Sequence, residues 1–266
     1  MPQPQETLIH RDYSNDHLVE IKDNGDFRSL YFSSSTLQGR MSLSSPPKLV
    51  LSYTQYMLLA LLIHPEPKSI LVIGIGAASF VRFFHHHFPQ SQVDAVDYSQ
   101  HIINAARGYF QLPENSRITV HCQDGYQYLK NYKASPYDLI LVDAFNDLGM
   151  APTIYSDKFF RLCARNLTQN GVVSCNIWSG NDTLLHETKY LLAAHFTSQL
   201  FLPVPERGNI ITLSLPGKIP WSKICLKGKK LAPLAKYFDL NFKEMVNVAK
   251  KNNMTLYKRF SSFMAS

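Results

Sequence analysis

The sequence predicts an α/β protein built on a mostly parallel seven-stranded sheet with helices on both faces. Apolar strands alternate with helical segments between residues 69 and 215. The first strand runs into a glycine turn, and the second ends in Asp97. Near-continuous apolar strands separated by helices indicate a parallel sheet that is covered on both faces. Right-handed crossovers then place the carboxyl ends of the strands, and any ligand site, on one edge.

A small β-rich segment is expected before this sheet, over residues 1–50. Residues 18–22 and 29–32 alternate apolar and polar side chains. The pair Asn24-Gly25 lies between them and is a strong signal for a hairpin turn. These residues therefore predict two antiparallel strands in the lead-in.

A helix rich in leucine and methionine is expected over residues 53–63, after a polar connector at residues 42–47. Pro65 ends this helix before the first strand of the main sheet. The main domain is predicted to span residues 51–215, and a basic helical C-terminal segment to span residues 216–266.

Within the main domain, each expected strand is a short apolar run, and each expected helix has apolar residues three to four positions apart. The expected strands are residues 70–73, 93–96, 118–121, 139–142, 171–176, 199–202 and 209–213. The expected helices are residues 80–88, 100–110, 126–131, 158–167 and 183–196.

The bulk composition is that of a globular protein. Its 266 residues are 45% hydrophobic and 18% charged, enough for a sizeable core. No apolar run approaches the roughly 18–20 residues of a membrane span, and the polar N-terminus does not resemble a secretory signal. Four scattered cysteines indicate reduced thiols. A cytoplasmic protein without a membrane partner is therefore expected.

The positive charge is concentrated at the C-terminus. Residues 218–266 hold eleven Lys and Arg against Asp239 and Glu244, whereas the rest of the chain holds 16 basic and 18 acidic residues. Such a segment could contact nucleic acid or acidic lipid. Because the lysines alternate with apolar residues at helical spacing, a packed helix with a lysine-rich outer side is favoured, and a nucleic-acid partner is not expected.

The glycine turn and the acid after it predict a nucleotide site. Gly74 and Gly76 let the backbone approach a ligand, and the following helix directs its N-terminus at it. Asp97 is placed to accept hydrogen bonds from ribose hydroxyls. The alternative is that Asp97 caps the next helix, a role that Ser99 could also fill.

Asp143 closes the fourth strand, where a buried apolar run meets a carboxylate at the ligand edge of the sheet. The three adjacent histidines at residues 85–87 point in different directions on a helix, so they do not predict a metal site. No metal is expected.

The order and spacing of these segments resemble the spermidine synthase-like family, which is built on the Rossmann-like class I fold of S-adenosylmethionine-dependent methyltransferases. The matching segments are residues 64–74, 96–97, 123–125, 137–143, 159–160, 171–173 and 176–180, within a resemblance that covers residues 50–215. The N-terminal and C-terminal segments are not well covered.

The resemblance assigns roles around the ligand edge. It implies that Asp97 holds the ribose, that Asp124 accepts from the adenine amino group, and that Gly125 makes room for the ring. Asp143 matches the catalytic aspartate, which orients the attacking amine and takes its proton. As alternatives to ligand binding, Asp124 could be a turn residue. Asp147 stands one place beyond the family's second aspartate, and a loop turn is its alternative role.

Three more residues are candidates for contact with the substrate. Tyr53 and Gln55 lie near a Tyr-Gln pair of the family, although core packing is an alternative for that helix. Trp178 follows the fifth strand and could form a wall of the amine channel or pack under the C-terminal helices. Residues 146–152 are expected to form a lid over the pocket.

One departure from the family concerns the donor. The family's glycine loop carries an aspartate that holds the amine of decarboxylated S-adenosylmethionine, and Ala77 stands at that position here. A helix N-terminus without this acid favours an anion, such as the carboxylate of S-adenosylmethionine itself.

Three functions therefore follow from the sequence. The first is transfer of an aminopropyl group from decarboxylated S-adenosylmethionine to a small amine such as putrescine. The second is methyl transfer from S-adenosylmethionine to a small molecule. The third is a binding module without catalysis that uses its basic tail. The resemblance also implies a dimer or a tetramer formed through the N-terminal strands, and a homodimer is a possible state of this chain.

Overall fold

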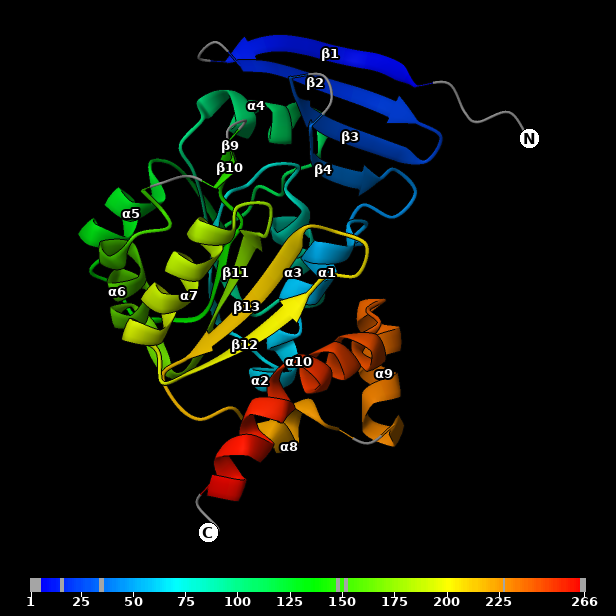
Figure 1. Ribbon diagram of the computed structural model, residues 1–266. Helices are drawn as coiled ribbons and strands as arrows, with labels where there is room; N and C mark the ends of the chain where they lie inside the picture. Colours follow the sequence, from blue (N-terminus) through cyan, green and yellow to red (C-terminus); the bar gives the residue numbers. More distant parts are fainter. Residues whose placement is uncertain are drawn as a thin grey trace.

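A seven-stranded sheet forms the centre of the molecule (Figure 1). The computed structural model describes residues 6–14, 17–33, 36–146, 149–150, 153–226 and 228–263. The strands of the main sheet are β5 (Ser69–Ile73), β6 (Gln92–Asp97), β7 (Ile118–Cys122), β8 (Tyr137–Val142), β11 (Leu167–Trp178), β12 (Ser198–Pro203) and β13 (Asn209–Leu215). Their spatial order is β12-β13-β11-β8-β5-β6-β7. Only β13 runs against its neighbours, so the predicted fold class is confirmed.

The register of the central strands sets the position of the ligand edge. Ile73 of β5 pairs with Val96 of β6 on one side and with Val142 of β8 on the other. The residues that follow Ile73, Val96 and Val142 therefore lie next to one another at the same edge of the sheet. The strand order reverses between β5 and β8, and such a switch point is where open α/β sheets bind ligands.

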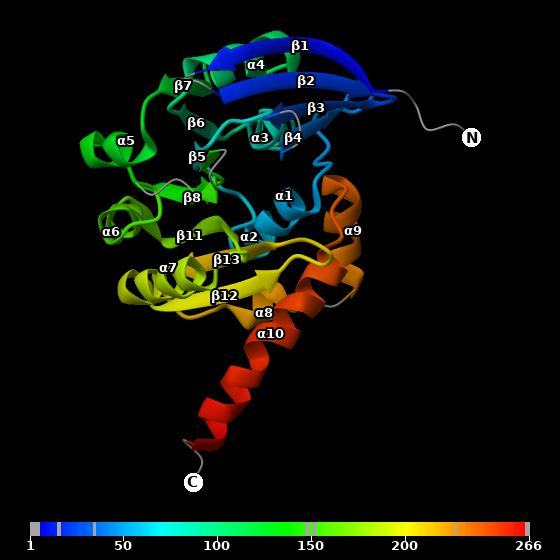
Figure 2. The ribbon, with the colours of Figure 1, turned by 45° about the horizontal axis from the view of Figure 1, so that its top comes forward.

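Helices cover both faces of the sheet (Figure 2). Side chains alternate along β5, so Ile70 and Val72 enter one core while Leu71 and Ile73 enter the other. The helices of the main domain are α1 (Ser52–Met57), α2 (Ala60–Ile63), α3 (Ser79–His87), α4 (Gln100–Tyr109), α5 (Gly125–Asn131), α6 (Asp157–Arg165) and α7 (Asp182–His195). Helices α5, α6 and α7 pack on one face, and α1, α2 and α3 pack on the opposite face.

The expected single helix over residues 53–63 is wrong, because α1 and α2 are separated by a turn at Leu58 and Leu59. The backbone N–H of Leu58 donates to Gln55, and that of Leu61 donates to Leu58, which is a tighter pattern than an α-helix. Every residue from Met57 to Ile63 is buried. A segment that is apolar on every side does not depend on one continuous helical stripe to bury its side chains. The turn at Leu58 and Leu59 therefore leaves them buried.

The N-terminal lead-in is a four-stranded antiparallel sheet in the order β1-β2-β3-β4. Its strands are β1 (Thr7–Ser14), β2 (His17–Asn24), β3 (Phe27–Phe32) and β4 (Thr36–Ser42). The expected hairpin corresponds to β2 and β3, and Gly25 in their turn has φ +58°. Strands β1 and β4 were not predicted, because both are polar and β4 contains Gly39. Leu30 and Met41 pack with Ala105 of α4 and with Ala77 of the glycine loop.

The C-terminal segment is helical, with α8 (Trp221–Ile224), α9 (Gly228–Phe238) and α10 (Phe242–Phe263). Helix α10 contacts β12, and its far end extends away from the sheet (Figures 1 and 2). Phe242, Met245 and Ala249 are buried, whereas Lys243 and Lys250 are exposed, as the sequence pattern predicted. Among the described residues, no helix has both the length and the apolar character to cross a membrane.

Two short strands lie in the segment that was expected to form a lid. They are β9 (Phe145–Asn146) and β10 (Gly149–Met150), and they pair antiparallel. Asp147 lies outside the described residues, so its predicted role stays a prediction.

Candidate active site

A cavity of about 1060 Å³ opens at the carboxyl edge of the main sheet. Its walls come from the ends of β5, β6, β8 and β11, from α1, and from β4 of the N-terminal sheet. Of the residues predicted from sequence, those that line it are Tyr53, Gly74, Gly76, Asp97, Asp124, Gly125, Asp143 and Trp178.

Gln55 is placed elsewhere. Its side-chain amide donates to the carbonyl of Leu49 at 2.8 Å, and Gln55 is not among the residues that line the cavity.

The glycine turn brings two strand ends into close contact. Gly74 has φ +92°, and a Cβ built on it would lie 2.0 Å from the carbonyl oxygen of Asp143. Its N–H donates to the carbonyl of Val96. Gly76 has φ +48°, and Ala78, which precedes α3, has φ +55° although it is not a glycine. The turn therefore depends on backbone conformations that side chains disfavour.

Asp97 stabilises this turn by accepting a backbone hydrogen bond from it. Its Oδ2 accepts from the N–H of Ile75 at 2.9 Å, and its Oδ1 accepts from the N–H of Ser99 at 3.0 Å. Burial raises the pKa of Asp97, and the backbone N–H donors oppose that rise. The helix cap is Ser99, whose Oγ accepts from the N–H of Ile102, so capping does not occupy Asp97.

Asp124 is a helix cap that also faces the cavity, and its adenine-binding role stays a prediction. Its Oδ1 accepts from the N–H of Gln127 and caps α5, while its Oδ2 accepts from the hydroxyl of Thr153 at 3.1 Å. The same carboxylate lines the cavity. Gly125 beside it is closely packed, since a Cβ there would lie 2.6 Å from Ile73.

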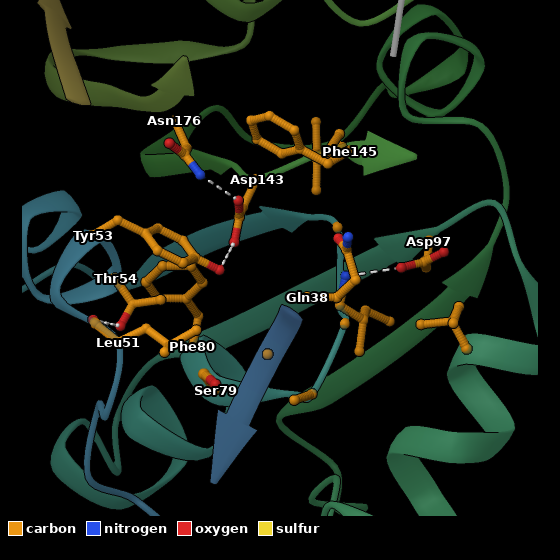
Figure 3. Close-up of a pocket in the computed structure, with 18 of the residues that line it drawn as sticks. Gln38, Leu51, Tyr53, Thr54, Ser79, Phe80, Asp97, Asp143, Phe145 and Asn176 are labelled. Carbon is orange, nitrogen blue, oxygen red and sulfur yellow. Dashed lines mark hydrogen bonds between the residues drawn. The ribbon is translucent and has the colours of Figure 1, made fainter. Parts of the chain in front are cut away.

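Asp143 lies between two hydrogen-bond donors (Figure 3). The hydroxyl of Tyr53 donates to its Oδ2 at 3.0 Å, and the amide of Asn176 donates to its Oδ1 at 2.9 Å. Burial raises the pKa of Asp143 to about 6, against the opposing effect of both donors. A carboxylate that titrates near neutral pH in a cavity is suited to accept a proton from a substrate.

Gln38, Asn176 and Asn209 are among the polar residues that line the cavity and were not predicted as site residues. Asn176 begins the segment 176–180 that carried part of the resemblance, so a signal for it existed. Gln38 lies on β4, which was not predicted, and Asn209 lies in β13 after a turn with no recognisable motif.

Trp178 forms part of the cavity wall and is 46% exposed. Two glycines flank its indole, since a Cβ on Gly180 would lie 2.3 Å from its Nε1 and a Cβ on Gly208 would lie 2.5 Å from its ring. The ring therefore packs against the β12–β13 turn at the cavity rim and not under the C-terminal helices. Within the part of the chain that the structure describes, no cluster of His, Cys, Asp or Glu could hold a metal ion.

Ala77 stands where the resemblance led us to look for an acid, and it packs closely against β4. It is 3% exposed, and a Cβ on Gly39 of β4 would lie 2.5 Å from the Ala77 Cβ. Ala77→Asp is expected to lower the free energy of unfolding by about 2–4 kcal/mol, because it overpacks this contact and buries a carboxylate. Ser79→Asp, in the first turn of α3, is the control and should leave stability nearly unchanged in denaturant unfolding. Equal stability of the two variants would contradict the packing argument.

Comparison with known proteins agrees with this architecture. The spermine/spermidine synthase domain model matches residues 52–211. A polyamine aminopropyltransferase of Chromobacterium violaceum is 36% identical over 239 residues, which are 88% of this chain and 90% of that protein. One from Neisseria meningitidis serogroup B is 31% identical over 244 residues, 91% and 92% of the two chains.

Solved structures share the fold. A spermidine synthase in complex with the transition-state analogue AdoDATO matches with a TM-score of 0.71 at 17% identity, over 91% of this chain and 84% of that one. Human methyltransferase-like protein 13 in complex with SAH matches with a TM-score of 0.61 at 22% identity, over 74% and 93%. With a family model that matches more than half of its length and relatives that align over nearly all of it, the chain belongs to the spermine/spermidine synthase family.

Proposed function

We propose that this protein transfers an aminopropyl group from decarboxylated S-adenosylmethionine to a small amine acceptor. The observation that carries the proposal is the carboxylate of Asp143, which lies in the cavity between Tyr53 and Asn176 at the end of β8. The relatives are named polyamine aminopropyltransferases, which favours this reaction over methyl transfer.

The donor would lie across the edge of the sheet. Asp97 would accept from the ribose hydroxyls, Asp124 from the adenine amino group, and the turn at Gly74 and Gly76 would let the backbone approach the sulfonium end. The sulfonium carbon would then lie near Asp143, because a Cβ built on Gly74 would meet the backbone carbonyl oxygen of Asp143 at 2.0 Å.

The acceptor would enter from the side of Tyr53 and Trp178, and Asp147 is a further candidate for binding it. Its amine nitrogen forms a bond to the donor carbon while the carbon–sulfur bond breaks, and the electron pair stays on sulfur as a neutral thioether. The attacking nitrogen gives up a proton, which Asp143 accepts. Asp143 then releases this proton to water, which restores the carboxylate for the next turnover.

Activity is expected to fall as the pH is lowered through about 6, the pKa of Asp143. Protonation of the carboxylate removes the acceptor for the amine proton, so the acid limb of kcat should follow this group. The measurement is kcat between pH 5 and 9 with saturating donor and acceptor. An acid limb that persists unchanged in Tyr53→Phe would contradict the assignment, because Tyr53 donates directly to Asp143.

The proposal is tested by incubating the purified protein with decarboxylated S-adenosylmethionine and putrescine and detecting spermidine and the released thioether by mass spectrometry. Calorimetry with the carboxylated and decarboxylated donors decides between the two transfer reactions. Preference for the decarboxylated form by at least tenfold, about 1.4 kcal/mol, is expected. No product with a range of amines, together with binding of S-adenosylmethionine alone, would overturn the proposal.

A homodimer formed through the N-terminal strands is part of the proposal. Among the described residues, β1 pairs only with β2, and Leu8 and Tyr13 on it are exposed. Light scattering of the intact chain would show a mass of two protomers.

A further inference from the structure

Two asparagines connect Asp143 to the strand on the far side of β11. Asn176 of β11 is 2% exposed, and its Nδ2 donates to Asp143. The Nδ2 of Asn209, at the start of β13, donates in turn to Asn176 Oδ1 at 2.9 Å. The paired residues Asn176↔Ile211 and Trp178↔Asn209 make Asn176 and Asn209 diagonal neighbours on adjacent strands. The result is a hydrogen-bonded chain from Asn209 through Asn176 to the carboxylate.

The two ends of this chain require the same orientation of the Asn176 side chain. An ionised carboxylate only accepts hydrogen bonds, so it needs the Asn176 NH2 group. The Asn209 NH2 group only donates, so it needs the Asn176 oxygen. A flipped Asn176 would place its oxygen against Asp143 and bring two NH2 groups together. As long as Asn209 presents its NH2 group, it opposes the flip even when Asp143 does not.

The fixed orientation of Asn176 removes a hydrogen-bond acceptor from the protonated form of Asp143. A protonated carboxyl can donate, and a flipped Asn176 would accept that hydrogen bond and stabilise the neutral acid. While Asn209 holds the Asn176 oxygen, this stabilising contact cannot form. Asn209 thus selects against the protonated form without touching the carboxyl group.

We propose that Asn209 is a positioning residue, which fixes the amide of Asn176 so that Asp143 always faces an NH2 donor and stays available as a proton acceptor. Each carboxylate oxygen has one protein donor, from Tyr53 or from Asn176, and keeps a second acceptor direction for an amine N–H. The role in turnover rests on the proposed function, whereas the effect on the carboxyl group itself does not.

Other groups near Asp143 come from each element packed against it. Tyr53 of α1 donates to it. Tyr155 precedes α6, and burial raises the pKa of its hydroxyl, with Cys175 and Asp143 raising that pKa further. The further charged groups that line the cavity are Asp97, Asp124, Glu206 and Arg207. Substitution of Asn209, Asn176 or Gln199 by leucine leaves all of these groups in place and adds no charge.

The experiment compares Asn209→Leu with the unaltered protein in the absence of any ligand. Carboxyl carbons of ¹³C-labelled aspartate are followed by NMR between pH 4 and 9, and the Asp143 signal is identified as the one that Asp143→Asn removes. The midpoint of its titration is expected to rise by about one pH unit, the size of a single hydrogen bond to a charged group. If the enzyme is active, the acid limb of kcat should move by the same amount while KM for the donor stays nearly constant.

The inference depends on transmission through Asn176, and a double-mutant cycle measures this. In an Asn176→Leu background, Asn209→Leu should no longer move the Asp143 midpoint. Gln199→Leu is the structural control, since this amide bonds carbonyls of the α7 region from β12 and does not line the cavity. It should change thermal stability but not the titration.

An unchanged midpoint in Asn209→Leu, or a midpoint that still moves in the Asn176→Leu background, would overturn the proposal. Asn209→Ser, whose hydroxyl is too short to maintain the contact, replaces Asn209→Leu if that variant does not fold. Absence of all transferase activity in the unaltered protein, with the titration result intact, would refute the proposed function and leave this inference standing.

Discussion

Asp143→Asn is expected to lower kcat by about 10²–10⁴-fold, the usual effect of removing a positioned proton acceptor. The substitution keeps the shape of the side chain. The new amide oxygen can accept from Asn176, and the new amide nitrogen can donate to the Tyr53 oxygen, so the contacts at 2.9 and 3.0 Å can persist. The loss of activity then reports on the missing carboxylate and not on a rearranged cavity.

The same substitution should not weaken the fold. The pKa of Asp143 lies at about 6 in the folded protein, above its ordinary value of 3.8. The folded state therefore binds this proton more tightly than the unfolded state. The stability that the protonated Asp143 carboxyl contributes is lost as the pH rises through about 6. At pH 8 the ionised carboxylate destabilises the fold, by at most about 3 kcal/mol. Asp143→Asn should accordingly raise Tm at that pH.

Asp138→Asn is the matched control, at the opposite end of β8. Its carboxylate accepts from the N–H groups of Lys68 and Ser69 and from the hydroxyl of Thr168, and it does not line the cavity. We expect lower Tm with activity retained, the reverse of the Asp143 variant. Steady-state assays and thermal unfolding at pH 8 measure both. A lower Tm for Asp143→Asn, or retained activity, would count against the role given to Asp143.

The sequence predicted the parts of this site that follow directly from local pattern. Apolar runs end at Ile73, Val96 and Val142, and parallel pairing then requires the next residues to meet at one edge. This argument needs no long-range information, because the register of parallel strands is set by their buried side chains. The glycine turn and its acid were recognisable for the same reason.

Contacts between distant segments could not be predicted in this way. Asn209 reaches Asn176 only because β13 runs antiparallel to β11, and no spacing along the chain indicates that pairing. The contact of β4 with the glycine loop likewise depends on how the N-terminal sheet packs on α4. From sequence alone, the absence of an acid at Ala77 suggested a different donor. The structure adds a contact that the sequence could not indicate, because Ala77 packs directly against Gly39 of β4.

Gly74→Ala is expected to destabilise the protein by on the order of 3 kcal/mol or more and to abolish activity. The new Cβ would lie 2.0 Å from the carbonyl oxygen and 2.7 Å from the carbonyl carbon of Asp143, so β5 and β8 must separate at their ends. The backbone at φ +92° is also strained for any side chain. Because the displaced atoms belong to Asp143, even a folded variant would hold its carboxylate out of position, and a displacement of about 1 Å can lower a rate by roughly 10²-fold.

Gly108→Ala provides the opposite case in the same domain. Gly108 is exposed near the end of α4, and a Cβ there meets no atom within 4 Å. This substitution should stabilise the protein by about 0.5–1 kcal/mol, since alanine loses less backbone entropy than glycine in a helix. Denaturant unfolding of both variants, with kcat measured on whatever folds, separates the two positions. If Gly74→Ala behaved like Gly108→Ala, the close approach of the glycine turn to Asp143 would not be what shapes this site, and the placement of the donor beside that carboxylate would have to be abandoned.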